Sequence, residues 1–147
     1  MTVPTNRTRR LIRVLSPAAL FALGIASVSA AEWPAFKPGI WTFERTMTDA
    51  GAAPTRVSST RCTDPTADQR QQQAMLGKSG CQFTPLTHSG KTYRYSATCT
   101  MAGMTSKSDS VLEVASAEAY TITVDSVVNG TKSQEVLQAR RIGDCKK

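Results

Sequence analysis

The sequence predicts a mainly β domain: a single antiparallel, curved sheet, either a meander or a half-barrel, with one short helix and two disulfides. Three observations support this prediction. Most segments after residue 36 alternate apolar and polar side chains with period two, which is typical of half-buried strands. Only one segment has the residues that start a helix. The chain also has four cysteines and no Cys-x-x-Cys pair, a pattern that favours disulfides over a metal site.

Residues 1–30 predict a cleaved secretory signal peptide. A segment with four arginines and no acidic residue comes first, an apolar stretch from Leu15 to Ile25 follows, and the small residues Val28-Ser29-Ala30 form a cleavage site. We expect cleavage after Ala30 or Ala31, which leaves residues 31–147 as one disulfide-stabilised β domain. The pair Arg9-Arg10 is compatible with twin-arginine export as well as general secretion, and this choice stays open.

Export changes what the charge implies. The whole chain has 18 basic and 11 acidic residues, but four of the basic residues lie in the first thirty, which leaves a net charge of +3 afterwards. No basic patch interleaved with aromatic residues remains, so we expect no nucleic-acid partner. No later apolar stretch approaches the length of a membrane span. The sequence therefore predicts a periplasmic or secreted protein with no transmembrane segment after cleavage.

The first half of the mature chain predicts a hairpin and a helix. "KPGIWTFERTMT" places Trp41, Phe43 and Met47 on one face of a strand. "DAGAAP" turns the chain, and the polar stretch "TRVSSTRC" is typical of an edge strand. The helix is expected to begin after the capping residue Asp64 and to end at Gly77. We expect its thin apolar side to lie against the sheet, and that side consists of Ala67, Ala74 and Met75.

The second half predicts strands around residues 93–99, 110–114 and 120–124, followed by a hairpin at Asn129-Gly130. Both central residues of a type I′ turn need positive φ, which this dipeptide favours. The turn fixes a register, which places Cys145 on the face of Leu137 and Ala139 if the strand stays regular past Gly143. The expected pairs are Val128 with Thr131, Val124 with Glu135, Ile122 with Leu137, Tyr120 with Ala139 and Glu118 with Arg141.

The same reasoning gives a preferred cysteine pairing. If Cys81 and Phe83 point inward with Tyr95, Ala97 and Cys99, the hairpin needs an odd-length loop such as Ser89-Gly90-Lys91, and Cys81 faces Cys99. Cys62 then pairs with Cys145. The alternative, Cys62 with Cys81 and Cys99 with Cys145, stays open because spacing alone does not determine connectivity. The spacings of 19, 18 and 46 residues disfavour zinc.

Several landmarks together resemble the exported bacterial family called domain of unknown function 3617. They are the motif Pro38-Gly39-Ile40-Trp41, a cysteine before a helical insertion, a cysteine that opens a hairpin, the string "SATCT" and the closing "ARRIGDC". The resemblance covers essentially the whole mature chain, although the helical segment is unusually rich in glutamine here. It implies a small exported domain of Gram-negative bacteria with no assigned activity. It therefore supplies no catalytic residue.

The sequence favours a binding module over an enzyme. His88 is the only histidine, and triad, zinc-protease and phosphate-loop patterns are absent, so we expect no catalytic residue and no cofactor. Aromatic residues on the inner face of a curved sheet are able to line a cavity for an apolar molecule, a lipid or an envelope partner, but the same residues are also able to form the core. They are Trp41, Phe43, Tyr93, Tyr95 and Tyr120.

Two other functions stay open. Met101 and Met104 flank a possible turn at Gly103, with Cys99 nearby and Met47 as a further candidate, and soft sulfur ligands select Cu(I). Against this metal site stands the common role of methionine as an apolar filler, with Cys99 oxidised. The other alternative is a purely structural or interaction protein whose function lies in its surface.

Overall fold

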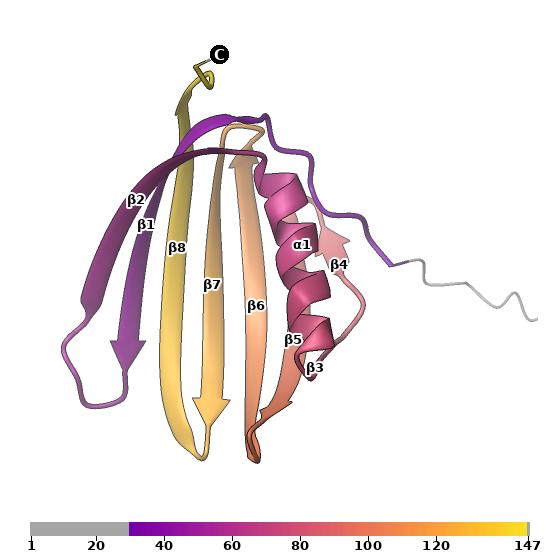
Figure 1. Ribbon diagram of the computed structural model, residues 1–147, viewed down its shortest axis with the longest axis vertical. Helices are drawn as coiled ribbons and strands as arrows, with labels where there is room; N and C mark the ends of the chain where they lie inside the picture. The colour runs from indigo at the N-terminus through magenta and orange to yellow at the C-terminus, as the bar shows by residue number, and fades with distance from the viewer. Residues whose placement is uncertain (1–29, 147) are drawn as a thin grey trace, which may run out of the picture.

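The computed structural model describes residues 30–146, which fold into one sheet and one helix (Figure 1). The elements in chain order are β1 (Gly39–Asp49), β2 (Thr55–Thr63), α1 (Pro65–Lys78), β3 (Cys81–Phe83), β4 (Thr87–Ser89), β5 (Thr92–Met101), β6 (Met104–Ser116), β7 (Ala119–Val128) and β8 (Thr131–Gly143).

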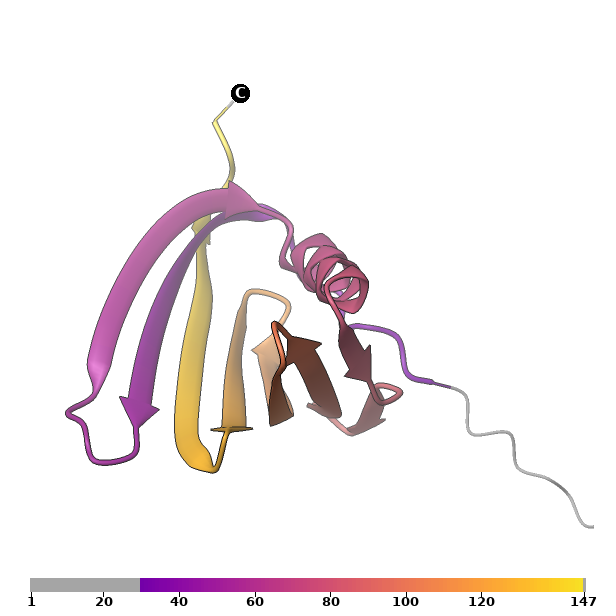
Figure 2. The ribbon, with the colours of Figure 1, turned by 60° about the horizontal axis from the view of Figure 1, so that its bottom comes forward.

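Every strand pairing is antiparallel, and the order across the sheet is β2-β1-β8-β7-β6-β5-β3, with β4 also beside β5. Strands β5 to β8 form a meander. Strand β1 then pairs with β8, so the first and last strands are neighbours. The sheet bends into an open arch, and α1 lies over part of its concave side (Figure 2). The predicted fold class is therefore confirmed.

The Asn129-Gly130 hairpin has the predicted register. The φ angles of Asn129 and Gly130 are 49° and 82°, as a type I′ turn requires. Because directly opposite residues share a face of the sheet, this register places Tyr120, Ile122 and Val124 of β7 on the concave side together with Leu137 and Ala139 of β8. The pairs are Val128 with Thr131, Val124 with Glu135, Ile122 with Leu137 and Tyr120 with Ala139.

The hairpin that contains Cys81 has the predicted pairing but a different loop. Cys81 lies opposite Cys99, and the two form a disulfide. The predicted three-residue loop is wrong, because Ser89 pairs with Thr92 and only Gly90 and Lys91 form the turn. The odd residue is accommodated instead by the break between β3 and β4, where Leu86 turns into the interior and is buried.

The condition for placing Cys145 on the face of Leu137 and Ala139 is not met, because β8 does not stay regular. A bulge shifts its pairing with β1, so that Arg141 faces Trp41 but Gly143 faces Ile40. Ile40 also faces Cys62, so the bulge moves the end of β8 onto the side of Cys62. Cys145 lies beyond the strand and forms a disulfide with Cys62, with a Cα–Cα distance of 5.5 Å. The two disulfides are the preferred pairing of the sequence analysis.

The helix α1 begins as predicted, but its inner side differs. The Asp64 side chain caps the helix by accepting hydrogen bonds from two backbone N–H groups. The helix continues through Gly77 to Lys78, and the chain reverses at Gly80, where φ is 101°. The predicted apolar side is wrong: Met75 is 59% exposed, and Ala67 and Ala74 are exposed as well. The residues that α1 buries are Pro65 and Gln69.

The two ends of the domain meet in a group of contacts that we call the clasp: Pro38, Gly39, Glu118, Arg141 and Asp144. The nearly buried Arg141 guanidinium donates from Nε to Pro38 O over 2.9 Å. It also forms ion pairs with Glu118, at 3.4 Å, and with Asp144. The Arg141 backbone N–H donates to Glu118 O over 2.9 Å. The clasp thus connects the start of β1, the β6–β7 turn and the end of β8.

Position 39 requires glycine because β8 passes very close to the Gly39 Cα within the clasp. A Cβ at this position would lie 2.4 Å from both Arg141 Nε and Gly143 O. Real Cβ atoms do not approach other atoms so closely, so any side chain would displace β8 or break the hydrogen bond to Pro38. Trp41 follows two residues later and is fully buried, with its indole N–H donating to Lys37 O over 3.1 Å. The motif Pro-Gly-Ile-Trp therefore has a structural explanation.

We expect Gly39→Ala to lower the free energy of unfolding by about 1–3 kcal/mol, the usual cost of overpacking. The matched control is Gly77→Ala, because a Cβ there meets nothing within 4 Å and alanine favours a helix interior by up to about 1 kcal/mol. Chemical denaturation of both variants measures the difference. Equal stability of the two variants would show that the close approach at Gly39 is not a constraint.

Candidate ligand site on the concave face

The five aromatic residues predicted to line a ligand site divide into two groups. Trp41, Phe43 and Tyr120 are buried and pack together, with the Trp41 and Tyr120 ring centroids 5.7 Å apart. They belong to the hydrophobic core. Tyr93 and Tyr95 are half-buried and lie farther across the sheet, on β5. Tyr93 stacks on His88, with centroids 5.2 Å apart.

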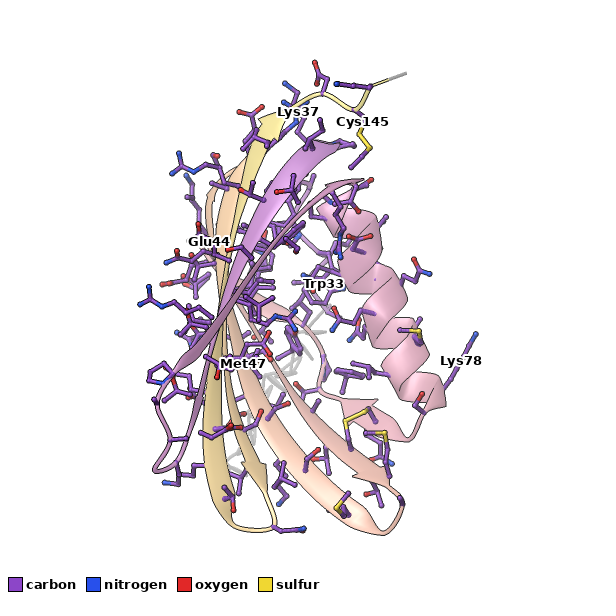
Figure 3. All side chains as sticks on the ribbon, turned by 60° about the vertical axis from the view of Figure 1, so that its left-hand side comes forward. Trp33, Lys37, Glu44, Met47, Lys78 and Cys145 are labelled. Carbon is purple, nitrogen blue, oxygen red and sulfur yellow. A yellow bond between two sulfur atoms is a disulfide. The ribbon has the colours of Figure 1, made fainter. Side chains whose placement is uncertain are left out.

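Two aromatic residues that sequence reasoning missed fill the space between α1 and the sheet. They are Trp33 and Phe36, in the segment 30–38, which we call the N-terminal arm. Phe36 is buried against Tyr120, with ring centroids 4.4 Å apart. Figure 3 shows Trp33 between the sheet and α1, while Glu44 points away on the opposite side of the sheet. The arm has no period-two pattern, so its burial had no signal beyond its aromatic content.

Hydrogen bonds attach the arm to the inner side of α1. The Phe36 backbone N–H donates to Thr66 Oγ1 over 2.8 Å, and the Thr66 hydroxyl donates to Pro34 O over 2.9 Å. Two helical turns further, Gln73 Oε1 accepts from the Trp33 indole N–H over 3.3 Å. The helix therefore covers the sheet through polar side chains and the arm, which explains why its inner side carries glutamine rather than leucine.

A groove of about 330 Å³ lies on the concave face between α1 and the strands β2, β1 and β8. We call it the inner groove. Its apolar lining residues are Phe43, Met47, Val57 and Leu137, and its polar lining comes from both strands and helix. Phe43 and Tyr120 are the predicted ligand residues that reach it. Its volume is at the lower end of the range for small-molecule sites in proteins.

The charged side chains of the inner groove are paired. Arg61 bonds Asp68 on α1 at 2.9 Å, and its guanidinium lies 4.7 Å from the centre of the Phe43 ring. Arg45 bonds Glu135 on β8 at 3.1 Å. Each arginine already has a carboxylate partner, so the groove offers an apolar floor and a neutralised rim. Such a lining suits a largely apolar molecule better than a strongly charged one.

The phenols of Tyr95 and Tyr120 are not suited to acid–base chemistry at neutral pH, because burial raises the pKa of both. Burial raises the pKa of Tyr120 to about 12, and the hydrogen bond with Gln69 opposes this shift. Burial likewise raises the pKa of Tyr95, opposed by a hydrogen bond with Ser110. Both hydroxyl groups therefore keep their protons at neutral pH, so neither provides the basic form that proton abstraction needs.

The methionine pair predicted as a metal site is only partly assembled. Met101 and Met104 lie directly opposite each other beside a two-residue turn, and they are 47% and 53% exposed. Cys99 is bonded to Cys81, and β8, β7 and β6 separate Met47 on β1 from β5. Between residues 30 and 146, no three or more His, Cys, Asp and Glu side chains gather in a group that could hold a metal.

The whole described segment also lacks a helix long and apolar enough to cross a membrane. All four cysteines are paired, which is consistent with an oxidising compartment outside the cytoplasm.

Comparison with known proteins identifies a family. The family model described as "Protein of unknown function (DUF3617)" matches residues 36–145, a range that runs from the core residue Phe36 to the terminal cysteine and includes the clasp and both disulfides. No curated protein and no solved structure matches the chain. The resemblance noted from the sequence is therefore confirmed, and the chain belongs to the DUF3617 family of proteins of unknown function.

Proposed function

We propose that this chain is an exported, non-enzymatic binding module that holds an apolar small molecule or a lipid chain in the inner groove. The observation that carries the proposal is the lining of that groove, where four apolar side chains border one cavity and both arginines are neutralised by carboxylates. An apolar ligand would cover the exposed part of this lining. The Cys62–Cys145 disulfide would hold one side of the groove in place, because Cys62 lies near the end of β2, close to the start of α1.

Export is part of the proposal. We propose that residues 1–30 form a cleaved signal peptide and that the folded domain works in the periplasm or outside the cell. Paired cysteines at positions far apart in the sequence support this placement, because such bonds form and persist in oxidising compartments.

Native mass spectrometry of the exported protein tests the ligand. We expect a mass above that of the mature chain, with the excess released as a small apolar molecule on denaturation. Val57→Asp places a charge in the inner groove and should abolish the excess mass. The matched control is Val127→Asp. Val127 is also an exposed strand valine, 39% exposed against 51% for Val57, but it lies on the convex side of the sheet, away from the inner groove.

A clean apo mass of the wild-type protein would contradict the proposal, as would retention of the ligand by the Val57→Asp variant. A stoichiometric protein in the purified complex would instead identify an envelope partner and a role as an interaction protein.

A second candidate function is Cu(I) binding by Met101 and Met104. The observation in its favour is their cross-strand pairing at an exposed hairpin end, which brings opposite Cβ atoms to about 5 Å. Soft thioethers select Cu(I). Titration with Cu(I) in ascorbate should give saturable binding to the wild-type protein.

The double variant Met101→Leu, Met104→Leu should abolish this Cu(I) binding. The control is Met75→Leu, which removes an exposed methionine of α1 and should leave Cu(I) affinity unchanged. Unaltered affinity in the double variant would exclude this site.

A further inference from the structure

A second groove lies on the other flank of α1. It has a volume of about 630 Å³ and is formed by the N-terminal arm, α1 and the segment from β3 to Leu86. We call it the Trp33 groove. Gln69 and Gln72 face the inner groove, whereas Arg70 and Gln73 line the Trp33 groove. The helix therefore separates two sites, and the larger one lies away from the inner groove on which the proposed function rests.

The apolar wall of the Trp33 groove is built from aromatic rings in fixed positions. Trp33 meets Tyr95 edge-on, with ring centroids 5.3 Å apart, and Phe83 packs on the same Tyr95 at 6.2 Å. The hydrogen bond from the indole to Gln73 fixes the orientation of Trp33. Trp33 and Phe83 thus both pack on the Tyr95 ring, and both line the groove. Pro85 and Leu86 line it beside them. Such a wall favours a flat, apolar molecule that stacks on aromatic faces.

The polar wall of the groove presents hydrogen-bond donors. Arg70 and Gln73 are three residues apart on α1 and so share one flank of the helix. Gln73 Oε1 is occupied by Trp33, so its amide NH₂ remains available as a donor. Arg45, Arg61 and Arg141 all form ion pairs, but none of the ion pairs found between residues 30 and 146 includes Arg70. A guanidinium with a neighbouring amide donor is suited to a carboxylate or another acidic group.

We propose that the Trp33 groove binds a flat, apolar small molecule that carries one acidic group. The ring system lies against Trp33 and Phe83, and the acidic group accepts hydrogen bonds from Arg70 and Gln73. Glu32 also lines the groove, on the arm, so the acidic group must lie on the helix side. Loss of the Arg70 charge should therefore weaken binding of an acidic ligand, whereas loss of the Glu32 charge should not.

Two probes with the same rings test the proposal on the exported protein with both disulfides formed. Anilinonaphthalene sulfonate has the aromatic body and one acidic group, and phenylnaphthylamine is the same body without the sulfonate. Both should bind the wild-type protein, as measured by equilibrium titration of probe fluorescence. Arg70→Gln should weaken sulfonate binding about tenfold, the usual effect of a lost charge-assisted hydrogen bond. It should leave binding of the uncharged probe unchanged.

The matched control is Glu32→Gln, which removes the opposite charge from the same groove and should leave sulfonate binding equal or tighter. Trp33→Leu should weaken both probes. Thermal unfolding of each variant accompanies the titrations, so that a folding defect is recognised by a lowered melting temperature and not by the loss of probe binding.

Three results would overturn the proposal: no sulfonate binding by the wild-type protein, unchanged sulfonate affinity in Arg70→Gln, or an equal loss of both probes in that variant. Val57→Asp distinguishes the two sites, because it changes the inner groove alone. Loss of sulfonate binding in Val57→Asp would place the probe in the inner groove and exclude the Trp33 groove. Failure of the proposed function in native mass spectrometry would leave the result of this titration unaffected.

Discussion

The fold depends on contacts that join the start of β1 to the end of β8. Arg141 holds Pro38 and Glu118, Gly39 allows the chains to approach, and the Cys62–Cys145 disulfide connects β2 with the chain beyond β8. Strand β1 lies between these two, so the disulfide spans it. A link across 83 residues contributes about 3–5 kcal/mol in the chain-entropy model, which is a large share of the stability of a small domain.

The clasp also explains why the most recognisable parts of the sequence do not identify an active site. The motif around Gly39 and the closing segment around Arg141 lie far apart in the chain, yet they contact each other. Their residues serve the closure of the fold. The ligand sites that we propose lie elsewhere, in the grooves on the two flanks of α1, where the chain places glutamines and arginines beside aromatic rings. The clasp fixes the root of the N-terminal arm, and the arm in turn supports the helix.

The sequence predicted the features that local patterns determine. Period-two alternation indicated the strands, and Asn129-Gly130 determined a register that extends along two strands. Three features could not be predicted, because tertiary contacts decide them. The bulge opposite Ile40 lies where β8 enters the clasp, and Gln69 is buried where α1 lies over the sheet, beside Tyr120. The burial of Phe36 depends on a space that exists only after helix and sheet assemble. The candidate site was therefore predicted in its general position, the concave face, but not in its residues: of the five predicted aromatics, Phe43 and Tyr120 reach the inner groove.

The stability of a variant without the terminal disulfide tests the role of the chain-end closure most directly. Cys62→Ala with Cys145→Ala removes the bond and leaves Cys81–Cys99 intact. Denaturant unfolding without reductant, followed by tryptophan fluorescence, should give a free energy of unfolding lower by about 3–5 kcal/mol. The fluorescence of the folded variant should shift to longer wavelength as water reaches Trp41, which is fully buried in the intact protein. Equal stability and an unchanged spectrum would contradict the account, because the fold would then not depend on the link between its ends.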